Sequence, residues 1–309
     1  MRFARIYIAL VLIAGTSCNK ALQLASLSFG VTADSSAHTL GVPYTFTFTG
    51  NPDLITFYSG EVGHRYAYNQ RVSDTSGTAQ LKFSTAVSGT NGTLSLLLST
   101  DYSGLIGYEG QLDSGGISAA TWTDITSRAV LATSTTTTSS GSVDLTDFMR
   151  QGQPVYVAFR YTAAAGSAQA KWTVSALSLT HTLPDSVYTI ANLTSTSPSP
   201  GWVAGHFFGD STINWNPTVT GATTASVIMA GGTTVATETA VTRWLVAGPI
   251  SLTRVLPDVG VAVKAITLLV PTYQYTYAKS GSYTATFFAA NVNADKEDST
   301  TRTINVTIQ

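Results

Sequence analysis

From residue 42 onward, apolar and polar residues alternate one by one along much of the chain. The stretch Val42-Pro-Tyr-Thr-Phe-Thr-Phe-Thr shows this most clearly, with aromatic residues separated by threonines. A period of two places successive side chains on opposite faces of an extended backbone, which is typical of a half-buried β-strand. Because the pattern recurs along the chain, the sequence predicts an all-β protein.

Turn clusters rich in Gly, Asn, Asp and Ser separate the alternating segments, as at Gly50-Asn-Pro-Asp. Short strands joined by such turns predict β-sandwiches. The Ser/Thr-rich tract 133–142 predicts an exposed loop or sheet edge, and a helical turn is expected over Leu145–Arg150, capped by Asp144. Further strands are expected at residues 54–58, 81–86, 93–99, 155–161, 172–180, 226–229, 282–289 and 303–308.

The composition limits both the stability and the partners of the chain. A single cysteine permits no internal disulfide, so stability must come from hydrophobic cores. Only 11% of the residues are charged and the formal net charge is −1, which argues against nucleic acid as a partner because phosphates require clustered Lys and Arg. A surface covered by Ser, Thr, Asn and Gln suits a neutral polyol such as a glycan, and it suits any other secreted β-protein equally well.

The N-terminus has the three parts of a secretory signal. Arg2 and Arg5 precede the apolar run Ile6–Ala14, and small residues lead to Cys18. This run is too short for a permanent membrane span, which needs roughly 20 residues. The run Gly15-Thr-Ser-Cys resembles the bacterial lipoprotein box, with Gly15 in place of the usual leucine. We therefore expect residues 1–17 to be a signal peptide, Cys18 to carry the lipid and residues 18–39 to form a tether; the alternative is an ordinary signal peptide with a chance cysteine.

The two ends of the alternating region resemble parts of one domain type. The stretch Tyr273–Asn291 resembles the final hairpin of the polycystic-kidney-disease (PKD) type of immunoglobulin-like domain, with a turn at Gly281. Tyr44–Thr49 and Leu54–Gly63 resemble its opening strands. The resemblance implies one discontinuous PKD-like β-sandwich made of residues 40–66 plus 250–309.

The middle of the chain has a different resemblance. Pro154–Thr162, Lys171–Leu179 and Arg243–Leu252 resemble strands of the galactose-binding-type jelly roll found in many carbohydrate-binding modules. This implies a jelly-roll β-sandwich over residues 67–249, inserted into the first sandwich. Such modules often hold a structural calcium ion, and Asp101 could contribute a carboxylate to one.

Together these features resemble a domain-of-unknown-function family of Bacteroidota outer-membrane lipoproteins, often encoded beside starch-utilisation-type transporters. Residues 51–66 and 255–264 carry the most specific resemblance. It implies a glycan-binding accessory role beside an outer-membrane transporter complex, with the membrane reached through the lipid anchor. We expect the cell surface rather than the periplasmic face. The run Asn19-Lys-Ala-Leu lacks the acidic residues that often follow the lipidated cysteine in surface-exported lipoproteins, which keeps the periplasmic face open.

The sequence shows no catalytic constellation. The four histidines lack metal-ligand spacing, and no Gly-x-Ser-x-Gly elbow occurs. We therefore expect no enzymatic activity and no cofactor beyond the calcium ion considered above. The charged run from Gly60 to Arg65 is interpreted as a turn made by two glycines, in which Glu61 pairs with Arg65 or a backbone N–H, rather than as a ligand site.

Aromatic residues are the remaining candidates for function, because sugars bind by stacking on aromatic rings. Trp122 is expected to be half-buried. The aromatic residues in alternating strands are expected in the cores: Phe46, Phe48, Phe57, Tyr156, Phe159, Trp172, Trp244 and Phe287. Those in Gly-, Ser- or Asn-rich contexts are the candidate glycan-binding residues: Tyr102, Tyr108, Trp202 and Trp215.

The expected function is non-catalytic binding of a neutral polysaccharide or oligosaccharide by an accessory lipoprotein of an uptake system. The alternative is a structural or adhesive envelope lipoprotein that binds a protein partner. Exposed tryptophans along a groove would favour the glycan, whereas a flat apolar patch would favour the protein partner.

Replacing Cys18 tests the anchor. We expect Cys18→Ala to move the protein from the membrane fraction to the soluble or periplasmic fraction, because the variant has no thiol to acylate. Fractionation followed by a high-salt wash measures this. A variant that stays membrane-bound at the wild-type level places the anchor elsewhere.

Overall fold

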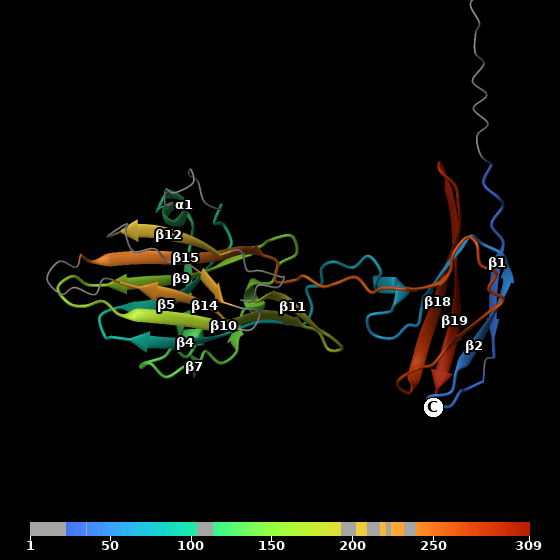
Figure 1. Cartoon of the computed structure of the whole chain (residues 1–309), viewed down its shortest axis with the longest axis horizontal. Helices are drawn as coiled ribbons and strands as arrows, with labels where there is room; N and C mark the ends of the chain where they lie inside the picture. Colours follow the sequence, from blue (N-terminus) through green and yellow to red (C-terminus); the bar gives the residue numbers. More distant parts are fainter. Residues whose placement is uncertain are drawn as a thin grey trace, which may run out of the picture. The chain divides into compact units, whose positions relative to one another are not determined.

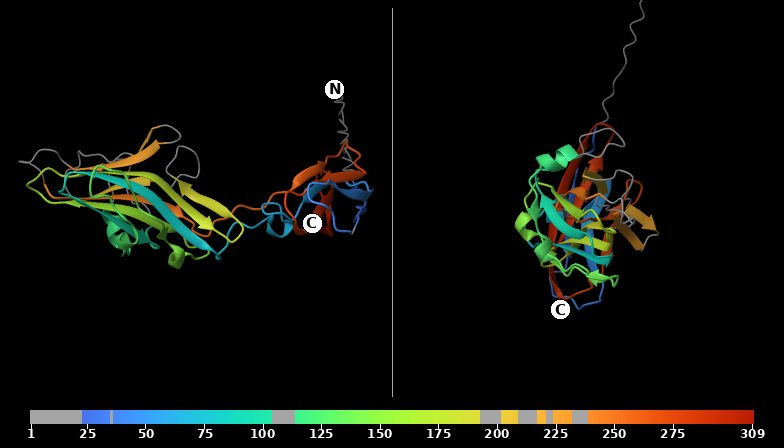
Figure 2. Two further views of the ribbon diagram at one scale, coloured as in Figure 1. Left: turned by 90° about the horizontal axis from the view of Figure 1, so that it is seen from below. Right: turned by 90° about the vertical axis from the view of Figure 1, so that its left-hand side faces the viewer.

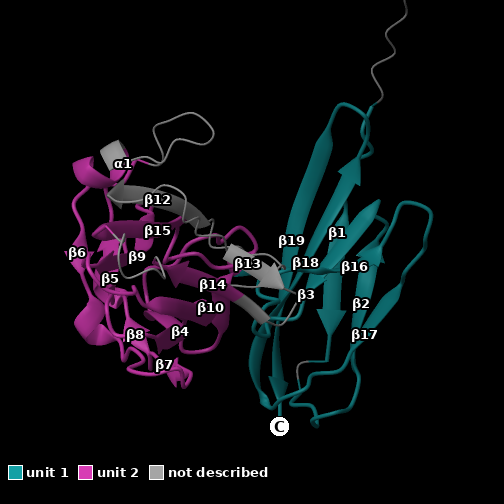
Figure 3. Ribbon diagram, turned by 60° about the vertical axis from the view of Figure 1, so that its left-hand side comes forward, with its two compact units in different colours: residues 1–67, 259–309 teal, residues 68–258 magenta. Residues whose placement is uncertain are grey.

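The computed structural model describes residues 23–34, 36–103, 114–192, 202–208, 217–220, 224–231 and 239–309 (Figures 1 and 2). The chain divides into two compact units, coloured separately in Figure 3. Unit 1 comprises residues 1–67 and 259–309, and unit 2 comprises residues 68–258. Strands make up nearly all of the regular structure, which confirms the predicted all-β sandwich fold.

The junctions between the units differ from the predicted ones on the C-terminal side. The predicted junctions lay at 66/67 and 249/250, and the structure places them at 67/68 and 258/259. Ile250 and Leu252 are buried in the core of unit 2. The amide of Asp74 donates to the carbonyl of Thr253, so the segment after β15 also belongs to unit 2.

Unit 1 is a sandwich of two antiparallel sheets. One sheet has three strands, in the order β1 (Phe29–Ala33), β2 (Tyr44–Gly50) and β17 (Thr272–Tyr275). β1 pairs with β2 and Phe29 is buried in the core, so the predicted tether over residues 18–39 is wrong from Phe29 onward. The other has four, in the order β16 (Val261–Lys264), β3 (Leu54–Tyr58), β18 (Gly281–Val292) and β19 (Glu297–Ile308). Three plus four strands is also the division of an immunoglobulin constant-type sandwich.

Aromatic rings fill the space between these two sheets. Along β2 the aromatic side chains are buried and the threonines between them are exposed, as the period of two predicted. Phe287 of β18 lies at the centre, with its ring centroid 4.9 Å from that of Phe46 and 4.8 Å from that of Phe57. Each such pair adds about 0.5–1.5 kcal/mol to the free energy gained by burying the rings.

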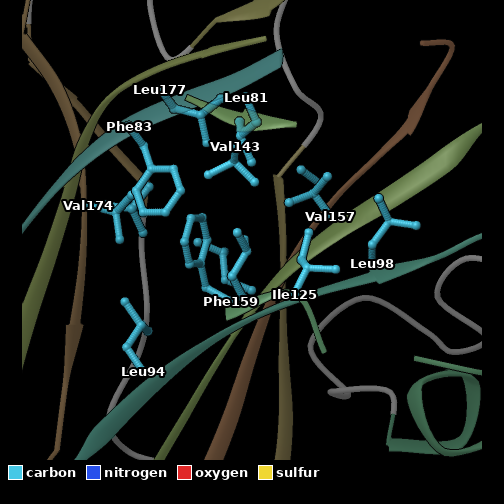
Figure 4. Packing of buried hydrophobic residues seen from close by; sticks show 14 of the residues in the cluster. Leu81, Phe83, Leu94, Leu98, Ile125, Val143, Val157, Phe159, Val174 and Leu177 are labelled. Carbon is cyan, nitrogen blue, oxygen red and sulfur yellow. The ribbon is translucent and has the colours of Figure 1, made fainter. Parts of the chain in front are cut away.

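Unit 2 is a larger sandwich. Its seven-stranded sheet contains β4 (Thr78–Ser88), β7 (Thr138–Ser139), β8 (Val143–Asp144), β10 (Lys171–Thr182), β11 (Val187–Asn192), β13 (Pro217–Thr220) and β14 (Thr224–Ala230). Its five-stranded sheet runs in the order β12 (Trp202–Phe208), β15 (Val241–Ile250), β9 (Val155–Ala163), β5 (Thr93–Ser99) and β6 (Thr123–Asp124). Apolar side chains from both sheets meet between them (Figure 4), and Phe83 of β4 contacts Phe159 of β9 edge to face at 5.1 Å.

Of the eight aromatic residues expected in the cores, seven are buried and Tyr156 is half-buried. The Ser/Thr-rich tract is largely exposed and contains the edge strand β7, as predicted.

The helical turn expected near Leu145 is a 3-10 turn, in which the Asp144 carboxylate accepts the amide of Thr146. The sequence did not indicate α1 (Ser114–Ala119). The 3-10 turns in the described chain are η1 (Tyr66–Tyr68), η2 (Thr126–Arg128) and η3 (Thr146–Phe148). Within the described ranges, no helix has the length and apolarity to cross a bilayer.

Isolating the C-terminal part of unit 1 tests its discontinuity. Residues 259–309 contain β18 but lack β2 and β3, so Phe287 loses its contacts with Phe46 and Phe57. We expect this fragment to show no cooperative unfolding transition by circular dichroism, because an unpaired edge and an open apolar face remain. A chain joining residues 23–67 to 259–309 through a short Gly/Ser linker is the matched control and should unfold cooperatively. Cooperative unfolding of the monomeric fragment contradicts the discontinuous sandwich.

Candidate functional site

The structure corrects the expectation of an exposed ring at Tyr102. This side chain is only 5% exposed. Its ring lies 5.6 Å from that of Trp122 and 5.0 Å from that of Tyr156, measured between centroids. Tyr102 packs against the outer face of the five-stranded sheet, where Leu97 and Ala158 belong to the same small cluster. The ring of Tyr102 is therefore buried, although Gly- and Ser-rich sequence around it predicted an exposed loop.

This outer cluster also explains the position of Trp122. Its indole Nε1 donates to the carbonyl of Ile117 over 2.9 Å, and its ring lies 5.0 Å from that of Trp244. Trp122 is half-buried, as predicted. The cluster packs the segment containing α1 onto the sheet, which is a structural role.

The other predicted site residues are not tested by these contacts. Trp202 does not lie in a loop. It is the first residue of strand β12 and pairs in register with Ala247 of β15. Its side chain is not among those that the structure describes. Tyr108, Trp215 and Cys18 lie outside the described residues. Their proposed roles stay predictions.

The carboxylate of Asp101 closes a turn after β5. It accepts the hydroxyl of Ser99 at 2.7 Å and the amide of Thr121 at 2.8 Å. These hydrogen bonds, that from Ser99 above all, lower the pKa of Asp101. Among the described residues, no three His, Cys, Asp or Glu side chains are grouped to hold a metal ion. The calcium ion at Asp101 stays a prediction.

Unit 1 contains a hollow of about 350 Å³ that the sequence did not indicate as a site. It lies where β3 ends and the chain passes from β17 to β18. Its volume is at the lower end of the range for small-molecule sites. The residues that line it are Glu61, Val62, His64, Tyr275, Ala278, Lys279 and Tyr283.

One wall of the hollow is the turn that follows β3. Gly60 and Gly63 both have positive φ, which confirms that two glycines make this turn. The amide of Gly60 donates to the carbonyl of His64 over 2.9 Å, and the amide of His64 donates to the carbonyl of Glu61 over 2.8 Å. A Cβ atom on Gly60 would lie 2.8 Å from backbone atoms of Thr284, so glycine is required there.

Glu61 is held in place by three donors. Its Oε2 accepts the hydroxyl of Tyr275 at 2.5 Å and that of Ser59 at 3.2 Å. Its Oε1 accepts the amide of Ala278 at 3.4 Å, which confirms the predicted pairing with a backbone N–H. Burial, and then the hydrogen bond to Glu61, raise the pKa of Tyr275. Its hydroxyl therefore remains a donor at neutral pH.

Tyr275 and Tyr283 form the aromatic side of the hollow, and buried Tyr277 packs against both rings. Tyr283 stacks on buried Tyr277 with centroids 4.5 Å apart and ring planes at 23°. Tyr277 meets Tyr275 edge to face at 5.0 Å. The Tyr283 hydroxyl donates to the carbonyl of Lys279 over 2.7 Å. These contacts fix the rings before any ligand arrives.

The sequence contained a signal for these tyrosines. Tyr273, Tyr275, Tyr277 and Tyr283 lie within eleven residues, and each phenol needs a hydrogen-bond partner if it is buried. Their closeness to Glu61 could not be seen, because it depends on pairing between distant strands.

The chain also matches a known family of domains. Residues 17–198 match the model of the family described as Domain of unknown function (DUF5017), which is more than half of the chain. The chain belongs to this family. The DUF5017 match ends inside unit 2, so it contains the Glu61 turn but not the tyrosines beyond residue 270. No curated protein and no solved structure matches the chain.

In this DUF5017 chain, replacing Tyr102 separates a packing role from a surface role. We expect Tyr102→Ala to lower the free energy of unfolding by about 3 kcal/mol, because a buried ring is lost from the outer cluster. Thermal or denaturant unfolding measures the change. Tyr68→Ala, at an exposed tyrosine of the same unit, is the matched control and should change stability far less. A loss within about 0.5 kcal/mol for Tyr102→Ala would instead indicate an exposed ring.

Proposed function

We propose that this protein is a non-catalytic glycan-binding lipoprotein of the bacterial outer membrane, which holds a neutral polysaccharide or oligosaccharide for an uptake transporter. The observation that carries the proposal is the hollow in unit 1, where fixed tyrosine rings stand beside a hydrogen-bonded carboxylate and an exposed lysine. Aromatic walls with a few placed polar groups are the usual composition of a sugar site.

The polar groups of the hollow complement sugar hydroxyls. A carboxylate offers about four acceptor positions, and Tyr275, Ser59 and Ala278 use three of those on Glu61. The remaining position can accept one sugar hydroxyl. The ammonium of Lys279 can donate to another, while the C–H face of the sugar lies against Tyr283.

The same residues support binding without cleavage. Hydrolysis of a glycosidic bond requires two carboxyl groups about 5–9.5 Å apart. Glu61 is the single carboxylate among the described residues that line the hollow. It is also committed to hydrogen bonds that fix its position.

The sequence supports the location and the partners. The apolar run before Cys18 supports lipid anchoring, and the resemblance to Bacteroidota lipoproteins supports the outer membrane, with the cell surface favoured over the periplasmic face. The same resemblance supports a transporter complex as partner. Trp202, Trp215 and Tyr108 stay proposed as further glycan contacts in unit 2.

Variants at the hollow test the site. We expect Tyr283→Ala and Lys279→Ala each to weaken retention on a gel of the neutral polysaccharide that the parent binds. Loss of the ring should cost about 2 kcal/mol, or roughly thirtyfold in affinity. Affinity electrophoresis across a panel of neutral polysaccharides measures this, with melting temperature recorded for each variant. Lys279→Ala should leave the melting temperature unchanged, because the side chain is exposed.

One control variant and two contrary outcomes complete this test. Tyr68→Ala removes a tyrosine from unit 2 and should keep full retention. If both hollow variants bind like the parent, the hollow is not the site. If the parent binds no glycan, the protein-binding alternative replaces this proposal.

A further inference from the structure

Unit 1 exposes a short apolar loop between β16 and β17. Ile266 is 59% exposed, Leu268 is 54% exposed and Leu269 is 79% exposed. The loop is ordered as a turn, since the amide of Leu268 donates to the carbonyl of Ala265 over 3.0 Å. It belongs to the apolar run Ala262–Val270, which Lys264 interrupts. Single exposed apolar residues are ordinary, but three within four residues indicate a contact surface.

Hydrogen bonds tie this loop to the place where the chain enters unit 1. The buried side chain of Asn291 donates to the carbonyl of Ala25 over 3.0 Å and accepts the amide of Asp53 over 3.0 Å. The carbonyl of Asp53 in turn accepts the ammonium of Lys264 at 3.3 Å. Lys264 directly precedes the loop, so Ala25 and the loop lie at the same end of the sandwich. Figure 1 shows the first described residues beside the β18–β19 turn at this end.

This end of the sandwich must lie close to any lipid on Cys18. Six residues lie between Cys18 and Ala25, which makes seven residue-to-residue steps. A fully extended chain spans at most about 3.3–3.6 Å per residue, which bounds the separation at about 25 Å. A linker of this length allows the loop to reach the bilayer surface that the lipid enters.

We propose that residues 265–269 insert into the membrane interface beside the lipid anchor. The proposal rests on the proposed lipidation of Cys18. It gives unit 1 a second point of attachment, and it gives the exposed Ile266, Leu268 and Leu269 an apolar environment. Acyl chains on Cys18 anchor the chain stably by themselves, so the loop would set the orientation of unit 1 at the bilayer rather than supply the anchor.

The charges at this end indicate which lipids are involved. The β18–β19 turn carries exposed Asp295, Lys296 and Glu297. The ammonium of Lys264 is buried and bound to carbonyl groups. Nothing in this set would attract anionic lipids, so contact comes from apolar insertion and should occur on zwitterionic bilayers.

A cysteine placed in the loop tests the insertion on the full protein. Because acylation blocks Cys18, Leu269→Cys offers a single reactive thiol for an environment-sensitive fluorophore. The labelled lipoprotein is reconstituted into vesicles of phosphatidylcholine and phosphatidylethanolamine. We expect its emission to shift to shorter wavelength and to be quenched by lipids that carry a nitroxide. Val42→Cys is the matched control: Val42 is exposed next to the backbone contact of Leu40 with Gln309, and its label should behave as in water.

Two results would contradict insertion of the loop, and a third would contradict the lipid anchor. A label at 269 that is as water-exposed as the label at 42 overturns the insertion. Adding Ile266→Asp and Leu268→Asp to the labelled loop variant should abolish the quenching, and persistence of quenching also overturns it. Uptake of fluorophore by the unsubstituted parent shows a free Cys18 and removes the anchor on which the proposal rests. None of these measurements depends on glycan retention, which the loop variants should keep.

Discussion

The pairing of β3 with β18 is the contact on which unit 1 depends. It joins residues 54–58 to residues 286–290, from opposite ends of the chain. Such a contact is costly to form, because the whole of unit 2 is the loop that it closes. Burial of the aromatic core offsets this loop-closure entropy. Phe57 and Phe287 are adjacent in the sheet and also contact Phe46 across the sandwich. Without the pairing, the C-terminal hairpin would have no core.

The candidate site is a product of the same pairing. Glu61 follows β3, whereas Tyr275 and Tyr283 flank the passage from β17 to β18. Their side chains meet only because the two segments are held side by side. Gly60 lets the turn approach the backbone of Thr284, which brings the carboxylate against the tyrosine hydroxyl. The hollow is therefore pre-formed, and a ligand does not have to order its walls.

The sequence predicted the strands well and the surface poorly. Alternation along β2 identifies its buried face because a half-exposed strand has a fixed period. Tyr102 shows the limit of this reasoning: its neighbours are small and polar, but its ring packs against an apolar outer face of a sheet. α1 was missed because it is short and rich in Gly and Ser. The site at Glu61 needed contacts between residues more than two hundred positions apart, which local patterns cannot report.

If Cys18 carries the proposed lipid anchor, the discontinuity of unit 1 also decides what a protease could release from the cell. In most anchored proteins, one cut beyond the anchor frees everything on its far side. Here a single cut inside unit 2 leaves two fragments, and each ends in strands of unit 1. The N-terminal fragment keeps β3 and the C-terminal fragment keeps β18, which remain joined by backbone hydrogen bonds and the shared aromatic core. Shedding of such an anchored protein would therefore require unfolding of unit 1 or a cut between Cys18 and the first residues bound to unit 1.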